Sequence, residues 1–232
     1  MTPDFSTRAA DLHEALEQDV CDAGLRLNSY RHFALLNPLL SRWRALYRRF
    51  IRPVLAQTPD EGRLLDIGFG GADIPLCLLQ WAQADGFRLQ VTSIDRNRKA
   101  LEFVQAQTWP SGMEFLCCTA AELLAQGRRF DVVLSNHILH ELEPRDMPAF
   151  LHDADALADK LVLFNDIRRS AWGYYLFAAG FGPVLRKSFA VSDGLLSIRR
   201  AYTVAEFRRR LPQGWEVRTL CPFRLLLIRH KP

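Results

Sequence analysis

The sequence predicts an α/β fold built on a mostly parallel β-sheet that ends in an antiparallel hairpin. Apolar strand-like segments alternate with helical segments between residues 63 and 166, which is typical of a parallel sheet with helical crossovers. A glycine-rich turn follows the first of these strands. The last two apolar strands are joined only by Cys221-Pro222, whereas a parallel crossover needs about a dozen residues. Seven strands are expected in all.

Composition narrows the class of protein. The 232 residues are 49% hydrophobic and 24% charged, with a net charge of +4, which is typical of globular proteins and does not single out nucleic acid as a partner. Five cysteines without a CxxC pair indicate neither a disulfide framework nor a zinc site. No leader peptide or membrane span is predicted, since the longest apolar stretch, residues 174–185, is short and broken by glycine and proline. We therefore expect a cytoplasmic protein.

Residues 1–60 are predicted to be helical. A first helix is expected to begin at Ser6 or Thr7 and to end at Gly24, and a second helical region covers residues 30–55 with an interruption near Asn37-Pro38. In the second region arginines alternate with aromatic and aliphatic residues. This pattern fits a membrane-surface helix or, as we favour, a helix whose aromatic face packs on a core. The turn at residues 58–62 is the best candidate boundary.

The alternating region gives each strand and helix in turn. Strands are predicted at 64–67, 89–94, 113–117, 130–134, 160–164, 215–220 and 223–228. Helices are predicted at 74–84, 98–107, 120–126 and 146–158. Residues 165–211 are long, aromatic and glycine-containing, and they hold no obvious strand.

Two acidic strand ends indicate a cofactor site. Asp66 ends the first strand and is followed by Gly68, Phe69 and Gly70, an arrangement that lets the chain turn sharply and present backbone N–H groups to a ligand. Asp95 ends the second strand, at the interval where a carboxylate accepts both hydroxyls of a ribose. The pair fits either a nicotinamide cofactor or S-adenosylmethionine.

At this point the sequence resembles the class I S-adenosylmethionine-dependent methyltransferases. The matching segments are residues 64–72, 93–97 and 130–136, together with the terminal hairpin. Residues 136–142 and 165–170 resemble bacterial small-molecule methyltransferases of the quinone and polyketide tailoring type. The resemblance implies a Rossmann-like, seven-stranded fold that binds S-adenosylmethionine and releases S-adenosylhomocysteine.

The resemblance also implies roles for individual residues. Asp66 and the glycine turn face the amino-acid part of the cofactor, while the main chain of Ser135 and Asn136 lies by its methionine moiety. The acid that many members place after the third strand is replaced by Thr119, so that Thr119 or the main chain of Ala120 is expected to meet the adenine. The implied cofactor-binding set is Asp66, Gly68, Phe69, Gly70, Asp95, Arg96, Thr119, Ala120, Ser135 and Asn136.

We expect methyl transfer by in-line displacement to a small acceptor, an aromatic, polyketide or quinone-like molecule that is methylated on oxygen. His137 or His140 is the candidate base, although a packed, structural histidine remains the alternative for each. No metal is expected, because the spacing suggests no third ligand beside the two histidines. Asp166 is predicted either to orient a histidine or substrate or to cap a helix. Arg168 or Arg169 is a candidate to meet a carboxylate on the acceptor, although we favour exposure of both on the surface.

By the same resemblance, residues 1–60 form a substrate cap and residues 61–232 the methyltransferase domain, with a lid at about residues 167–212. Alanine at Tyr174, Tyr175 or Phe177 is expected to raise the acceptor KM. The remaining alternatives are an RNA or other macromolecule methyltransferase, a nicotinamide-dependent oxidoreductase and a non-catalytic cofactor-binding partner protein. The expected partner is a small molecule, with nucleic acid disfavoured, and the chain is expected to be a monomer or a homodimer.

Overall fold

The computed structural model describes residues 3–12, 22–183, 185 and 188–231. Its centre is a single seven-stranded sheet with the strand order β3-β2-β1-β4-β5-β7-β6. The first five strands run parallel, and β7 pairs antiparallel with both β5 and β6. The predicted α/β fold with a terminal antiparallel hairpin is thus confirmed.

The predicted strands are all present, and several are longer than their apolar segments suggested. Their bounds are β1 (Glu61–Ile67), β2 (Arg88–Asp95), β3 (Met113–Cys117), β4 (Phe130–Asn136), β5 (Ala158–Ile167), β6 (Glu216–Leu220) and β7 (Arg224–His230). The central strands β1 and β4 are almost wholly buried, as parallel strands covered on both faces are expected to be.

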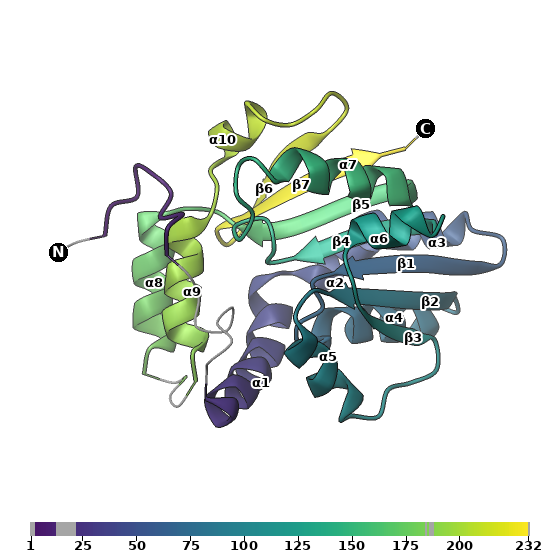
Figure 1. Cartoon of the computed structure of the whole chain (residues 1–232), viewed down its shortest axis with the longest axis horizontal. Coiled ribbons are helices and arrows are strands. Elements are labelled where there is room, and N and C mark those ends of the chain that lie inside the picture. Colours follow the sequence, from purple (N-terminus) through teal and green to yellow (C-terminus); the bar gives the residue numbers. More distant parts are fainter. Residues whose placement is uncertain (1–2, 13–21, 184, 186–187, 232) are drawn as a thin grey trace.

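Helices cover both faces of the sheet (Figure 1). The alternating region supplies α4 (Asp73–Ala84), α5 (Arg98–Gln105), α6 (Ala120–Ala125) and α7 (Met147–Leu157). The helices α8 (Ala171–Phe181), α9 (Ala190–Arg200) and α10 (Val204–Arg208) lie between β5 and β6 in the sequence. The antiparallel pair α8 and α9 stands beside α1, beyond the carboxyl ends of the parallel strands (Figure 1).

The N-terminal helices differ from the prediction. Residues 3–12 are not helical, so the expected start at Ser6 or Thr7 is wrong; residues 13–21 of that segment lie outside the described residues. Helix α1 (Ala23–Leu40) contains Gly24 in its first turn and passes through Asn37-Pro38. The interruption comes instead at Arg42, whose backbone is left-handed with φ of 55° and therefore cannot continue a right-handed helix.

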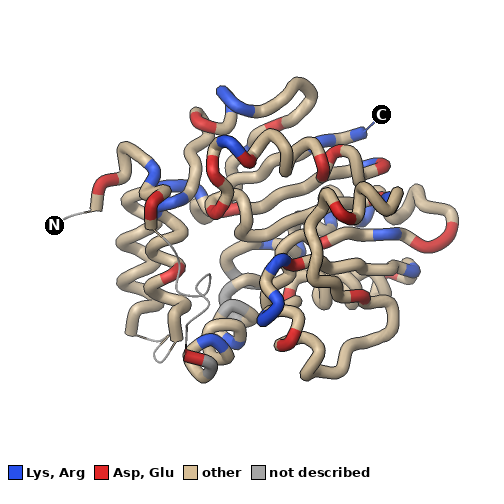
Figure 2. Tube along the Cα trace, in the orientation of Figure 1, with Lys and Arg blue, Asp and Glu red and all other residues tan. Residues whose placement is uncertain are grey.

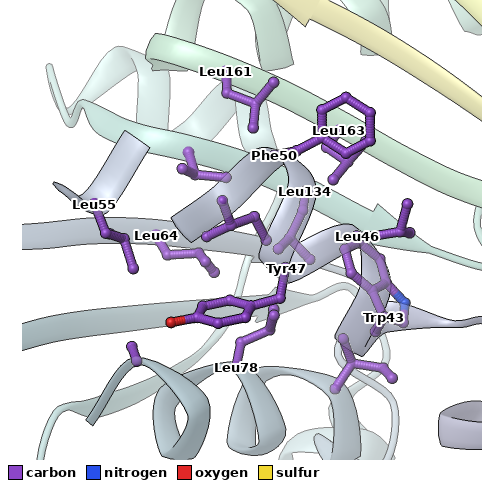
Figure 3. Close-up of a cluster of buried hydrophobic side chains, with 14 of the residues drawn as sticks. Trp43, Leu46, Tyr47, Phe50, Leu55, Leu64, Leu78, Leu134, Leu161 and Leu163 are labelled. Carbon is purple, nitrogen blue, oxygen red and sulfur yellow. The ribbon is translucent and has the colours of Figure 1, made fainter. Parts of the chain in front are cut away.

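The arginine-rich segment packs on the core, as we favoured over a membrane-surface helix. It forms α2 (Trp43–Leu46), a π-helical turn η2 (Tyr47–Ile51) and α3 (Arg52–Ala56). Its apolar side chains point at the sheet and at α4 (Figure 3). The buried members from this segment are Trp43, Leu46, Tyr47, Phe50, Ile51 and Leu55.

Charged residues are spread along most of the chain. Lys and Arg are spread over most of the trace rather than gathered in one stripe, and α8 carries no charged residue (Figure 2). Within the described residues, no helix is long and apolar enough to cross a membrane.

Candidate active site

A cavity of about 1350 Å³ opens at the carboxyl ends of the parallel strands. It is larger than the roughly 300–1,000 Å³ of a typical small-molecule site. The glycine turn after β1 lines one end, and residues of α8 and α9 line the other. Of the cofactor-binding and catalytic residues predicted from sequence, those that line this cavity are Asp66, Gly68, Phe69, Gly70, Asp95, Arg96, Thr119, Ala120, Asn136, His137 and His140. Ser135 is the exception in this set: it is buried in β4 and does not line the cavity.

The turn after β1 has the left-handed backbone that its glycines allow. Gly68 has φ of 82°, and a Cβ there would collide with the side chain of Ile138. Its N–H donates to Ile94 O at 2.7 Å, which holds the turn against β2. Ala72 stands where the motif has its third glycine; it also adopts positive φ, at 60°, and its methyl group fits in a small buried cluster beside Phe69.

Asp66 is a buried acid with an oxygen that the described residues leave without a partner. The residue is only 2% exposed, and its Oδ2 accepts no hydrogen bond. Burial raises the pKa of Asp66 well above its ordinary value, and the nearby carboxylates of Asp73 and Asp95 add to this. A buried carboxylate oxygen of this kind needs a hydrogen-bond donor, which a ligand in the cavity can supply.

Asp73 is a second acid at this end, and it was not among the predicted site residues. It begins α4 and lines the cavity, and both of its oxygens lie within hydrogen-bond distance of Asn37 Nδ2 on α1, at 3.3 and 3.1 Å. Burial raises the pKa of Asp73 to about 6, although the Asn37 hydrogen bond opposes this. The sequence contained a signal for Asp73, because this acid directly follows the glycine-rich turn and precedes the helix predicted at 74–84.

Asp95 closes β2 with both oxygens directed at backbone donors. Oδ2 accepts from Gly70 N at 3.0 Å and Oδ1 from Asn97 N at 2.8 Å. The N-cap of α5 is Asn97, so Asp95 does not cap that helix. Burial raises its pKa. Each oxygen keeps a second lone pair for a ligand hydroxyl.

Thr119 is engaged by the protein itself. Its hydroxyl donates to Glu122 Oε2 at 2.8 Å and accepts from Glu122 N at 3.2 Å, which forms a capping box at the start of α6. Because Thr119 N also donates to Glu122 Oε2, at 2.7 Å, the main chain of Ala120 is better suited than Thr119 to meet a ligand.

The opposite end of the strand edge carries a buried histidine–aspartate pair. His140 Nδ1 lies 2.7 Å from Asp166 Oδ1, and His140 N donates to Asp166 Oδ2 at 2.9 Å. Both residues are at most 2% exposed. Burial alone would raise the pKa of Asp166, but His140, His137 and Arg224 outweigh it and hold that pKa well below its ordinary value. Asp166 lies inside β5, so it orients a histidine and does not cap a helix.

His137 has a different partner. Its Nε2 lies 2.5 Å from a guanidinium nitrogen of Arg224, a residue that sequence reasoning missed entirely. The ligand atoms of His137, His140 and Asp166 also lie within 4.8 Å of one another, so the structure supplies the third metal-ligand type that the spacing did not suggest. Arg224 already places a positive charge against this group, which makes it a poor site for a second cation.

Comparison with known proteins agrees with this geometry. Residues 64–159 match a family model described as a methyltransferase domain. A curated relative, the mitochondrial ubiquinone biosynthesis O-methyltransferase of Arabidopsis thaliana, is 30% identical over 145 residues, which is 61% of this chain and 44% of the relative. The chain therefore spans less than half the length of that relative.

Two solved structures share the fold. One is the plantazolicin methyltransferase BpumL in complex with a monoazolic desmethylPZN analog and SAH, with a TM-score of 0.56 at 14% identity. The match covers 89% of this chain and 96% of the BpumL chain. Magnesium protoporphyrin IX methyltransferase from Synechocystis, with bound SAH, has a TM-score of 0.50 at 16% identity and covers 92% and 90%. The family match thus places a methyltransferase domain at residues 64–159, and the two solved structures share the fold of the chain.

The cofactor end of this methyltransferase domain fits S-adenosylmethionine, the cofactor of the class. The cofactor carries an ammonium group, a sulfonium and a ribose diol, and the site offers three acids, the buried Asp66 and the half-buried Asp73 and Asp95. The unpartnered Oδ2 of Asp66 suits an ammonium donor, and the remaining lone pairs of Asp95 suit the diol. Three acids at one end of a cavity favour a ligand with net positive charge.

The other end of the cavity is mostly apolar. Phe177 lines it together with Leu176 and Phe181 of α8. Tyr174 and Tyr175 do not line it: their rings pack against Phe5, with centroids 5.4 and 6.4 Å away, so only one of the three aromatic residues singled out from sequence is placed to contact an acceptor.

The two neighbouring arginines also separate. Arg169 is buried and donates to Phe5 O, Ser6 O, Ala201 O and Glu206 Oε1, which makes it a structural residue. Arg168 lines the cavity, and its side chain has no hydrogen-bond partner among the described residues. Of the two, Arg168 is the one placed to meet an anionic group on a ligand.

Proposed function

We propose that this protein transfers the methyl group of S-adenosylmethionine to a hydroxyl of a small, flat acceptor of the aromatic, quinone-like or polyketide type. The observation that carries the proposal is that one cavity is lined by the acidic cofactor residues, by His140, which is paired with Asp166, and by apolar residues of α8 and α9. Reaction partners held in one cavity lose little further freedom on reaching the transition state.

The cofactor supplies an electrophilic methyl group, so the chain's own residues have to align the acceptor, exclude water and remove a proton. We assign proton removal to His140. Asp166 accepts the Nδ1 proton of His140, which makes Nε2 the basic nitrogen and stabilises the imidazolium when the acceptor hydroxyl loses its proton. The buried, hydrogen-bonded setting keeps the ring in one orientation.

The cofactor-binding set assigned from sequence belongs to this proposal, with Asp73 and Asn37 added to it. We also propose that residues 1–60 and 167–212 act as the cap and lid of the acceptor site. Supporting this, Tyr30 and Leu40 of α1 and Phe177 and Ile198 of the α8–α9 pair line the same cavity. The segment 43–56 serves the core instead.

Calorimetry tests the cofactor first. S-adenosylmethionine and S-adenosylhomocysteine should bind in the micromolar range, NAD should not bind, and Asp95→Ala should abolish binding. A panel of phenols and quinols with labelled cofactor then tests transfer, with the products examined for methylation on oxygen. Binding of NAD alone would overturn the cofactor assignment, while cofactor binding without transfer to any phenol would remove the acceptor class and leave a binding protein.

A further inference from the structure

The second histidine of the site, His137, has a role that neither the motif nor the base assignment gives it. It follows β4 with a left-handed backbone, φ of 64°, and its N–H donates to Asn165 O at 3.1 Å. The ring lines the cavity. Its ring plane is perpendicular to that of His140, at 89° with centroids 5.7 Å apart. The two histidines therefore stand side by side at the carboxyl ends of β4 and β5.

Arg224 controls one nitrogen of His137. Besides the 2.5 Å contact with His137 Nε2, its guanidinium donates to Asn165 Oδ1 at 2.9 Å, to Asn165 O at 3.1 Å and to Asn136 Oδ1 at 2.9 Å. Asn136 Oδ1 also accepts from Trp43 Nε1 at 3.0 Å. The guanidinium is thus fixed on three sides, at 2% exposure, and cannot turn away from the histidine.

The charge of Arg224 decides the tautomer. Burial lowers the pKa of Arg224 to about 10, so the group remains a cation at neutral pH. A guanidinium has donors and no acceptor, so His137 Nε2 has to accept, and the proton of the neutral ring has to lie on Nδ1. Burial, and then the charge of Arg224, also lowers the pKa of His137 well below its ordinary value, so the ring stays neutral.

We propose that Arg224 fixes His137 as the Nδ1–H tautomer and so makes it a hydrogen-bond donor to a proton-free oxygen of the acceptor, such as a carbonyl next to the reacting hydroxyl. The tautomer of His137 does not depend on the proposed function. Only the second part of the inference, the hydrogen bond to an oxygen of the acceptor, rests on it. Within the described residues Nδ1 of His137 has no hydrogen-bond partner, so a ligand in the cavity is the partner that remains. Arg224 is then a positioning residue, and the two histidines divide the work: His140 takes a proton and His137 gives a hydrogen bond.

Nitrogen NMR of the ring tests the tautomer without any need for activity. The full chain is labelled with ¹⁵N-histidine and saturated with S-adenosylhomocysteine, and the His137 signals are assigned by their loss in His137→Gln. The expected pattern is a protonated Nδ1 and an unprotonated Nε2, and it should stay the same between about pH 5.5 and 8, the range in which an ordinary histidine titrates. A protonated Nε2, or a ring that titrates across this range, would overturn the proposal.

Substitution of Arg224 tests the cause. In Arg224→Met the fixed tautomer should give way to a mixture that titrates, and Arg224→Lys, which keeps a cationic donor, should restore part of the wild-type pattern. Arg229→Met is the matched control, because Arg229 lies on the same strand but binds Asp155. Since the wild-type spectrum already tests the tautomer, the proposal stays falsifiable if Arg224→Met does not fold.

Two probes test the acceptor half. The ketone 2-hydroxyacetophenone and its near-isostere 2-ethylphenol are titrated into protein saturated with S-adenosylhomocysteine. One neutral hydrogen bond predicts that the ketone binds about three- to tenfold more tightly, and that His137→Ala removes the difference. Equal affinities, or no binding of either probe, overturn the carbonyl assignment. If the ketone binds tightly and selectively but no methyl transfer is detected, the result contradicts the proposed function and leaves this inference standing.

Zinc provides the last arm. Equimolar Zn²⁺ should leave the His137 signals in place, because Arg224 and the Nδ1 proton occupy the two ring nitrogens. If Zn²⁺ shifts the signals of both His137 and His140, the group formed with Asp166 is a metal site and the proposal is wrong.

Discussion

Two buried aspartates at the same edge of the sheet behave in opposite ways. Asp66 ends β1 and Asp166 lies near the end of β5, and both are at most 2% exposed. Asp166 accepts from the ring and the backbone of His140, whereas Oδ2 of Asp66 has no donor among the described residues. The pKa of Asp166 is correspondingly lowered, and that of Asp66 is raised.

At one end of the site the protein itself balances the charge of its buried aspartate, and at the other end it leaves an oxygen of a buried aspartate without a hydrogen-bond donor within the described part of the chain. At the Asp166 end the chain supplies the counter-charge itself, through Arg224 and the two histidines, so the geometry exists before any ligand binds. At the Asp66 end three acids converge on the cavity with Asn37 and backbone N–H groups as their donors. An unsatisfied acid of this kind weakens the ligand-free protein and strengthens binding of a cation.

The largest effect on turnover is expected from a substitution of Asp166. Asp166→Asn keeps the shape of the side chain but removes the charge that orients and stabilises His140. Turnover should fall by about 10²- to 10⁴-fold, with little change in cofactor affinity. The free energy of unfolding should also fall, by about 3 kcal/mol, because Arg224 loses its buried counter-charge. Steady-state rates, calorimetry and thermal melts measure the three quantities.

Asp146→Asn is the control for this change, because Asp146 lines the same cavity but its side chain is 60% exposed. It should leave all three quantities close to wild type. If Asp166→Asn lowered cofactor affinity as much as turnover, the separation between the two ends would not hold.

Asp66→Asn should show the opposite combination. Loss of one charge-assisted hydrogen bond predicts cofactor binding about 10- to 150-fold weaker. The ligand-free protein should become more stable at pH 8, by about 1 kcal/mol or 2–4 °C in Tm, because a buried carboxylate without a donor is removed. A fall in Tm would mean that Asp66 is satisfied by the protein after all and does not await a ligand.

The sequence predicted the parts of the molecule whose signals are local. The strands, the hairpin and the acids Asp66 and Asp95 follow from short patterns of apolar residues, glycine and strand ends. The packing of residues 43–55 followed from their aromatic face. The break at Arg42 did not, because a single left-handed residue among good helix formers leaves little trace in the sequence.

The pairings inside the site are not local, and the sequence did not contain them. His137 and Arg224 are 87 residues apart, and Asn37 and Asp73 are 36 apart. Arg224 lies in a strand that was predicted only as one half of a hairpin, and nothing in its neighbourhood marks it as a site residue. Only the antiparallel position of β7 beside β5 brings it to the ends of β4 and β5.

The smallest expected effect is a pH dependence of cofactor binding that follows from the titration of Asp73. Because the pKa of Asp73 is raised to about 6, the carboxyl is ionised at pH 7 and becomes protonated as the pH falls below 6. A cationic cofactor should therefore bind up to about tenfold more weakly at pH 5 than at pH 7, the change that one proton produces over one pH unit below its pKa. Calorimetric Kd values across this range measure it.

The same titration has the opposite sign for stability. A carboxyl whose pKa is raised in the folded state from 3.8 to about 6 favours folding when protonated, so its destabilising contribution is present above pH 6 and is lost as the pH falls toward 4. In Asp73→Asn the affinity for the cofactor should no longer depend on pH, and it should equal the weaker affinity that the wild type has at low pH. Asn37→Ala should move its midpoint upward, because Asn37 opposes the rise in the pKa of Asp73. An unchanged pH dependence in Asp73→Asn would assign the titration to another acid of the cluster and leave Asp73 as a structural partner of α1.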